Sequence, residues 1–116
     1  MINYNNRVFK SVSNTSNGEV SSETIFHYYQ ENDIVWATYK GGEILFGNLI
    51  AKADRQGCLH MRYQHINIDN DFRTGECVSK PEELEDRRLR MHETWQWTSG
   101  DYSKGTSILE EIIAEA

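Results

Sequence analysis

Short runs of β-forming residues, each ended by turn residues, follow one another along this 116-residue chain. The runs are rich in Val, Ile, Thr and aromatic residues, and clusters of Asn, Asp, Ser and Gly separate them at intervals of roughly 10 to 15 residues. This spacing is typical of an antiparallel β fold. We expect eight strands, over residues 7–13, 24–30, 34–40, 43–53, 58–67, 72–79, 89–98 and 103–113.

The predicted connections are short hairpin turns, except for a longer charged segment over residues 82–88 that follows Pro81. Each strand is therefore expected to pair with the next in an up-and-down meander, and closing an eight-stranded meander into a small barrel removes its exposed edges. The fold predicted is all-β, a small up-and-down barrel forming one domain over residues 1–116, with residues 1–6 as a flexible tail. The last segment has a helical alternative, because its apolar residues also recur at helical spacing: Ile108, Leu109, Ile112 and Ile113.

Side chains alternate across each strand, so the turns decide which face of the sheet becomes the barrel interior. A turn over residues 31–33 pairs Tyr28 with Trp36, and a Gly41-Gly42 turn then pairs Trp36 with Gly47. A turn ending at Gly57 pairs Leu49 with Tyr63 and Ala51 with Met61, which continues this parity into the fifth strand. The interior predicted for the first half contains Phe26, Tyr28, Trp36, Thr38, Leu45, Gly47, Leu49, Leu59, Met61, Tyr63 and His65.

The opposite face of the same strands is also apolar. Two explanations are open. Either this outer face forms an interface between copies of the chain, or the inside and the outside of the first half are the reverse of those assigned above. The residues that the predicted parity places outward are Ile25, Tyr29, Tyr39, Ile44 and Phe46.

The seventh strand has the clearest alternation and places a carboxyl group inside. Its polar set is Arg90, His92, Thr94 and Gln96, and its inward set is Leu89, Met91, Glu93, Trp95 and Trp97. A buried carboxyl must be paired, hydrogen-bonded or protonated, because burying it alone costs several kcal/mol. Gly105 and Ser107 of the eighth strand share the inward parity and leave room beside the Trp rings.

Aromatic walls with a few converging polar groups are typical of small-ligand cavities, and an eight-stranded barrel is either filled or just wide enough for one small ligand. Both interpretations stay open here. If the interior is hollow, the candidate ligand-binding residues are Tyr28, Trp36, Thr38, Tyr63, His65, Glu93 and Trp95. No catalytic residue and no cofactor are predicted, although Glu93 and His65 are the pair to consider for acid–base chemistry.

The charge balance disfavours anionic partners. The chain carries 18 Asp and Glu against 12 Lys and Arg, a net charge of −6, so we expect neither nucleic acid nor an anionic membrane as partner. The polar start and the short apolar runs favour a cytoplasmic protein with Cys58 and Cys77 as free thiols. No metal site is expected, because the histidines show no ligand spacing: His27, His60, His65 and His92.

Several stretches resemble a family of small bacterial proteins, above all the run Leu89-Arg90-Met91-His92-Glu93-Thr94-Trp95-Gln96-Trp97-Thr98-Ser99-Gly100-Asp101. Shorter matches are Thr24-Ile25-Phe26-His27-Tyr28, Val35-Trp36-Ala37-Thr38-Tyr39-Lys40-Gly41-Gly42 and Thr74-Gly75-Glu76-Cys77. Members are often labelled N-acetylglutamate synthase, and their fold is similar to avidin-like or lipocalin-like barrels, which implies a calycin-like barrel for this chain. The resemblance implies a barrel, names an acetyltransferase activity and supplies no catalytic residues.

Three functions therefore compete. The first is a barrel that binds a small molecule in its interior, the second is an acetyltransferase, and the third is a self-associating structural module. The chain lacks the glycine-rich loop that opens a helix on the cofactor pyrophosphate in acetyl-CoA-dependent enzymes. We therefore expect ligand binding.

Overall fold

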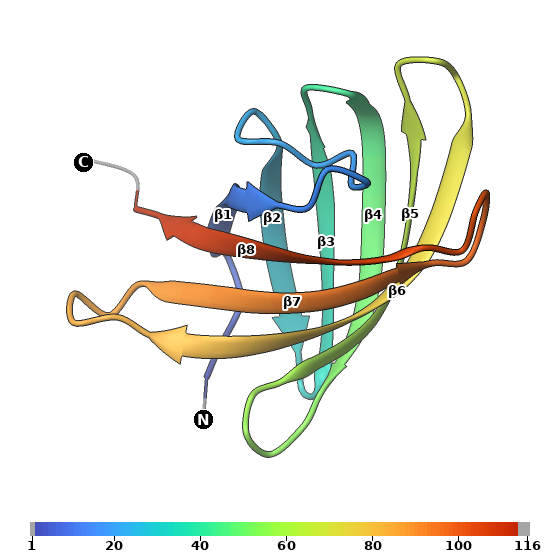
Figure 1. Cartoon of the computed structure of the whole chain (residues 1–116). Helices are drawn as coiled ribbons and strands as arrows, with labels where there is room; N and C mark the ends of the chain where they lie inside the picture. The colour runs from blue at the N-terminus through green and yellow to red at the C-terminus, as the bar shows by residue number, and fades with distance from the viewer. Residues whose placement is uncertain (1, 114–116) are drawn as a thin grey trace.

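Eight antiparallel strands form a closed barrel in the computed structural model, which describes residues 2–113 (Figure 1). Each strand pairs with the next, and the last pairs with the first. The all-β meander is therefore confirmed, and the segment before residue 113 is a strand and not a helix. The strands are β1 (Val8–Asn14), β2 (Ile25–Glu31), β3 (Ile34–Gly41), β4 (Ile44–Ala53), β5 (Leu59–Asn67), β6 (Phe72–Glu83), β7 (Leu89–Trp97) and β8 (Lys104–Ile112).

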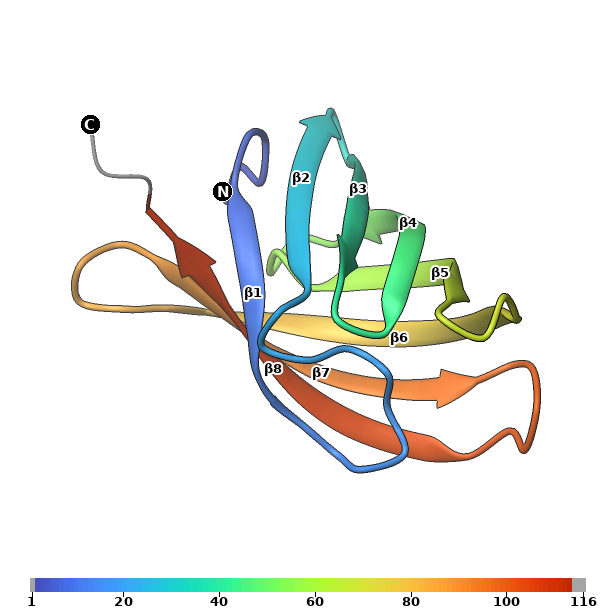
Figure 2. The same cartoon turned by 90° about the horizontal axis from the view of Figure 1, so that it is seen from above.

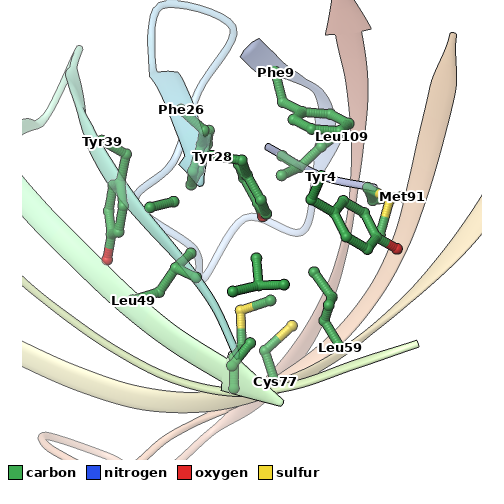
Figure 3. Packing of buried hydrophobic residues seen from close by; sticks show 14 of the residues in the cluster. Tyr4, Phe9, Phe26, Tyr28, Tyr39, Leu49, Leu59, Cys77, Met91 and Leu109 are labelled. Atoms are coloured by element: carbon green, nitrogen blue, oxygen red, sulfur yellow. The ribbon is translucent and has the colours of Figure 1, made fainter. Parts of the chain in front are cut away.

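The inward side chains of all eight strands meet in one core (Figure 3). On β7 the predicted alternation is confirmed, because Met91 is fully buried and Trp95 and Trp97 are almost so. Tyr28 lies near the centre of the cluster, with its ring centroid 4.8 Å from that of Phe9 on β1. Within residues 2–113 there is no helix that could cross a membrane.

The segment before β1 packs against the barrel. Tyr4 is completely buried, and its hydroxyl donates a hydrogen bond to the Gly57 carbonyl oxygen. Its backbone N–H donates to Gln30 Oε1 at 2.8 Å, and the Asn6 N–H donates to the Tyr28 carbonyl oxygen at 2.8 Å. The expected flexible tail is therefore wrong for residues 2–6, because one aromatic anchor outweighs the polar residues around it.

The turn between β2 and β3 is one residue shorter than the sequence predicted. It has two residues, Asn32 and Asp33, with Asn32 at a φ of +56°, and Glu31 pairs with Ile34. Tyr28 therefore lies opposite Ala37, and Trp36 lies opposite Tyr29. The slip turns Trp36 and Thr38 to the outside of the barrel, because side chains alternate with every residue.

The next turn moves by one residue as well. It is formed by Gly42 and Glu43 instead of Gly41-Gly42, and irregular pairing interrupts the ladder between Tyr39 and Gly41. Tyr39 therefore points inward and pairs with Gly47, whereas Leu45 is half exposed. The inward prediction for Leu45 and the outward predictions for Tyr39 and Ile44 are wrong.

Three inward aromatic side chains each lie across from a glycine on the neighbouring strand. The pairs are Tyr39 with Gly47, Tyr63 with Gly75 and Trp95 with Gly105. At each glycine an added Cβ would overlap the ring of its partner. Each ring thus lies against backbone that carries no side chain, so the close approach causes no clash.

Strand β6 continues through Pro81 to Glu83, although the sequence predicted an end near the proline. Its neighbour β5 pairs with β6 only as far as Ser79, so Pro81 lies where β6 has a partner on one side. A proline is tolerated there because its missing N–H is needed by no second strand. The connection to β7 is consequently a short turn over residues 84–88.

Candidate functional site

A cavity of about 50 Å³ lies inside the barrel and reaches one of its ends. Residues from all eight strands form most of its wall, and the loop between β1 and β2 contributes the rest. This volume holds a few water molecules, since each needs roughly 10 to 15 Å³ by this measure. The aromatic part of the wall consists of Phe26, Tyr39, Tyr63, Trp95 and Trp97.

Glu93 is the carboxyl group of this interior. It lies on β7 between Ser79 of β6 and Ser107 of β8, and the Ser107 hydroxyl donates to Glu93 Oε1 at 3.0 Å. Burial raises the pKa of Glu93 to about 7, although the two neighbouring serine hydroxyls act in the opposite direction. At neutral pH this carboxyl therefore exchanges a proton, and it offers a ligand either a donor or an acceptor.

The Tyr28 hydroxyl group is buried near Glu93 without a hydrogen-bond partner. Burial, together with the charge of Glu93, raises the pKa of Tyr28 well above its usual value, so this phenol stays protonated and able to donate. An unpaired buried polar group costs about 1 to 3 kcal/mol, so such groups need an explanation in a native structure.

Glu19, on the loop between β1 and β2, closes the end of the cavity. Its carboxylate accepts hydrogen bonds from His65 Nε2 at 2.8 Å, from Arg73 Nη1 at 2.8 Å and from Asn67 Nδ2 at 3.2 Å. His65 and Asn67 share the inward face of β5, and Arg73 lies directly across from His65 on β6. Three strand-borne donors thus surround one loop-borne carboxylate.

His65 is held in place from both ring nitrogens. Nε2 faces Glu19, and Nδ1 lies 3.0 Å from the Tyr39 hydroxyl. Burial lowers the pKa of His65, against the opposing effect of Glu19. The ring is therefore neutral near pH 7, with the proton on Nε2, so that Tyr39 donates to Nδ1.

The loop between β1 and β2 has further bonds to the rim of the barrel. Trp97 Nε1 donates to the Asn17 carbonyl oxygen at 3.0 Å, and the Asn17 side chain donates to the Lys104 carbonyl oxygen at 2.8 Å. Figure 2 shows this loop, in blue, running beside β8 and returning past the turn between β3 and β4. The loop therefore covers one end of the barrel and is held there by these hydrogen bonds.

Five of the seven predicted ligand-binding residues lie in the interior, and two do not. Tyr28, Tyr63, His65, Glu93 and Trp95 point inward. Trp36 is 37% exposed and faces outward with Thr38, so their inward placement is corrected. Two further residues of the site, Glu19 and Arg73, were not predicted from the sequence pattern. Continuing the parity from His65 through the next turn identifies Arg73 as inward, but nothing in the pattern of the loop marks Glu19.

A family model described as "Avidin-like protein" matches residues 2–112. The chain belongs to the avidin-like family. No curated protein and no solved structure matches this avidin-like chain. The N-acetylglutamate synthase label implied by the sequence resemblance finds no support in these comparisons.

The described part of this avidin-like barrel contains no cluster of metal ligands, and its buried cysteine is not activated as a nucleophile. Across residues 2–113, no three His, Cys, Asp or Glu side chains gather where they could hold an ion. Both cysteines are free, and burial together with Glu93 raises the pKa of the Cys77 thiol well above its usual value. Since the thiolate is the nucleophile, Cys77 is a packing residue.

Proposed function

We propose that this protein binds a small, partly polar molecule inside its barrel, entering at the end covered by the loop between β1 and β2. The polar end of the ligand reaches Glu93, and its apolar part lies against the aromatic wall. Membership of the avidin-like family supports an interior ligand, and the strand-borne wall supplies a rigid frame for it.

The observation that carries this proposal is an unmatched polar group near Glu93. Tyr28 Oη is buried and unpaired close to this carboxyl, which belongs to the cavity wall and has a pKa raised to about 7. A filled core would be more stable with an apolar group in place of this hydroxyl, since an unpaired group costs about 1 to 3 kcal/mol. A ligand that pairs with it would recover that cost.

Tryptophan fluorescence tests the proposal, because Trp95 and Trp97 line the cavity and Trp36 lies on the outer wall. Benzamide, a small aromatic molecule with one donor and one acceptor group, is a suitable probe. It is larger than the closed cavity of about 50 Å³, so its binding requires the loop between β1 and β2 to move aside. We expect a saturable change of emission at millimolar concentrations. Trp36→Phe should keep this change, and Tyr28→Phe should weaken binding about fivefold or more without unfolding the protein.

Trp36→Phe is the matched control, since it removes the same chromophore from the other side of the sheet. A non-saturable response, or a response lost in Trp36→Phe and retained in Trp95→Phe, would contradict an interior site. Unchanged affinity in Tyr28→Phe would contradict a hydrogen bond between the ligand and the Tyr28 hydroxyl.

A second proposed property is self-association through the outer wall. Trp36 and Ile50 are neighbours on β3 and β4, exposed by 37% and 65%, and Tyr29 stacks on Trp36 with ring centroids 6.0 Å apart. An exposed apolar patch of this kind is typical of an interface.

Light scattering tests this second proposal. The wild-type chain is expected to be at least a dimer, and Ile50→Glu should make it a monomer because the substitution buries a charge in the interface. Ile68→Glu is the control, since Ile68 is 54% exposed in the turn between β5 and β6. A monomeric wild type at high concentration would refute the proposal.

A further inference from the structure

We propose that His65, Asn67 and Arg73 form a carboxylate-binding site for the ligand, and that Glu19 occupies this site in the free protein. The ligand class is then a small aromatic or aliphatic carboxylic acid. The inference rests on the proposed function, since the body of the ligand lies in the barrel interior. In this proposal the ligand carries a carboxylate group, and that group displaces the Glu19 carboxylate.

The three donors belong to the barrel and not to the cover. His65 and Asn67 are almost fully buried on β5, and the register of β5 and β6 places Arg73 beside His65. Asn67 is further fixed by its own Oδ1, which accepts the backbone N–H groups of Asp69 and Asp71 at 3.0 Å. These contacts of Asn67 do not involve Glu19.

Arg73 is oriented by an aromatic ring as well as by Glu19. Its guanidinium carbon lies 3.9 Å from the ring centroid of Trp97, and its Nε is buried with no hydrogen-bond partner. A guanidinium presents parallel donors that match the two oxygens of a carboxylate. Glu19 accepts from Nη1 and leaves Nε unpaired, so the guanidinium keeps a free donor for a differently placed carboxylate.

Glu19 is the removable part of this cluster. The strands supply every wall residue except three that lie on the loop between β1 and β2, namely Gly18, Glu19 and Val20. Moving this loop frees the carboxylate site and opens the cavity at the same place. The cavity of about 50 Å³ then joins the space vacated by the loop.

A tethered carboxylate competes with a free one at the same donors. The effective concentration of a group on a short loop is at least in the millimolar range, and a ligand that needs the open form loses affinity in proportion to the closed fraction. Removing the Glu19 side chain is therefore expected to tighten carboxylate binding. It should affect a neutral ligand of the same shape less.

Calorimetric titration with benzoate and with neutral benzamide, at constant ionic strength and pH 7.5, tests the inference. The measured quantity is the ratio of the two affinities. In Glu19→Ala we expect this ratio to favour benzoate about tenfold more than in the wild type. Adding Arg73→Gln to Glu19→Ala should abolish the gain, because the main cationic donor is lost.

Glu23→Ala is the matched control, since Glu23 lies on the same loop and is exposed away from the cluster. It should leave the ratio at the wild-type value. Circular dichroism verifies that each variant is folded, and Glu19→Gln replaces Glu19→Ala if the latter is not. Benzamide binding with an unchanged ratio in the folded Glu19 variant would overturn the carboxylate site and leave the proposed function intact. Absence of binding of both molecules in every variant would overturn both.

Discussion

Glu93→Gln is expected to melt about 10 °C higher than the wild type at pH 8, and only a few degrees higher at pH 5. The reason is the burial of the carboxyl, which raises its pKa to about 7 from a usual value of 4.5. Ionising it in the folded state costs about 3 kcal/mol, because each unit of pKa difference corresponds to 1.36 kcal/mol. Glutamine removes the charge and still accepts the hydrogen bond of Ser107.

The direction of this pH dependence follows from proton binding. Between pH 4.5 and 7 the folded protein holds the Glu93 proton and the unfolded chain has lost it, so the free energy of unfolding falls as the pH rises. Above pH 7 both states are ionised and the full penalty remains. His65 has a lowered pKa and contributes the opposite slope below pH 6.5, because the folded state binds fewer protons there.

Comparing variant and wild type at the same pH cancels the contribution of His65. Thermal melts at pH 5, 6, 7 and 8 should therefore show a gap that widens with pH. Glu85→Gln is the control, since Glu85 is exposed in the turn between β6 and β7 and should give no such trend. A gap that is constant from pH 5 to pH 8 would show that Glu93 keeps the same charge throughout.

Gly105→Ala is expected to lower the free energy of unfolding by about 2 to 3 kcal/mol. Its added Cβ would overlap the indole of Trp95 and the hydroxyl of Thr15. Trp95 cannot easily move aside, because it is buried and its ring centroid lies 5.4 Å from that of Trp97. Urea denaturation gives the change directly.

A double-mutant cycle locates the cause of this loss. In a Trp95→Leu background the ring is gone, so Gly105→Ala should cost at least 1 kcal/mol less. Thr106→Ala, on the outer side of β8, should change the stability by no more than about 0.5 kcal/mol. Equal losses from Gly105→Ala in both backgrounds would mean that the ring is not what the glycine accommodates.

The parts of the fold that could be predicted are those with an unbroken pattern or a distinctive turn. On β7 the alternation of five apolar or inward residues with polar ones has no rival register. The Gly57 turn, with Gly57 at a φ of +82°, places Leu49 opposite Tyr63 and Ala51 opposite Met61 as expected. These two elements also carry Glu93, Trp95, Tyr63 and His65, so most of the interior was correctly assigned.

The orientation of the side chains on β3 and at the start of β4 depended on the exact position of two turns. Residues 31–33 and 41–43 contain more turn-forming residues than a hairpin needs, and choosing the wrong pair reverses a whole strand. Trp36 and Tyr39 exchanged sides for this reason. Glu19 could not be found at all, because its role comes from a loop that folds over strands about 50 residues away in the sequence, as with His65 and Asn67.

The pairing of β8 with β1 closes the barrel, and it can form only after all the other strands have been synthesised. Arg7 and Glu111 form an ion pair across that seam although 104 residues separate them. During synthesis β1 has no second neighbour until the last strand has emerged, so its unpaired edge is exposed for nearly the whole translation of the chain. Such long-range closure is slow, and open edges recruit other chains. The incomplete barrel is therefore expected to be more prone to aggregation than the closed one.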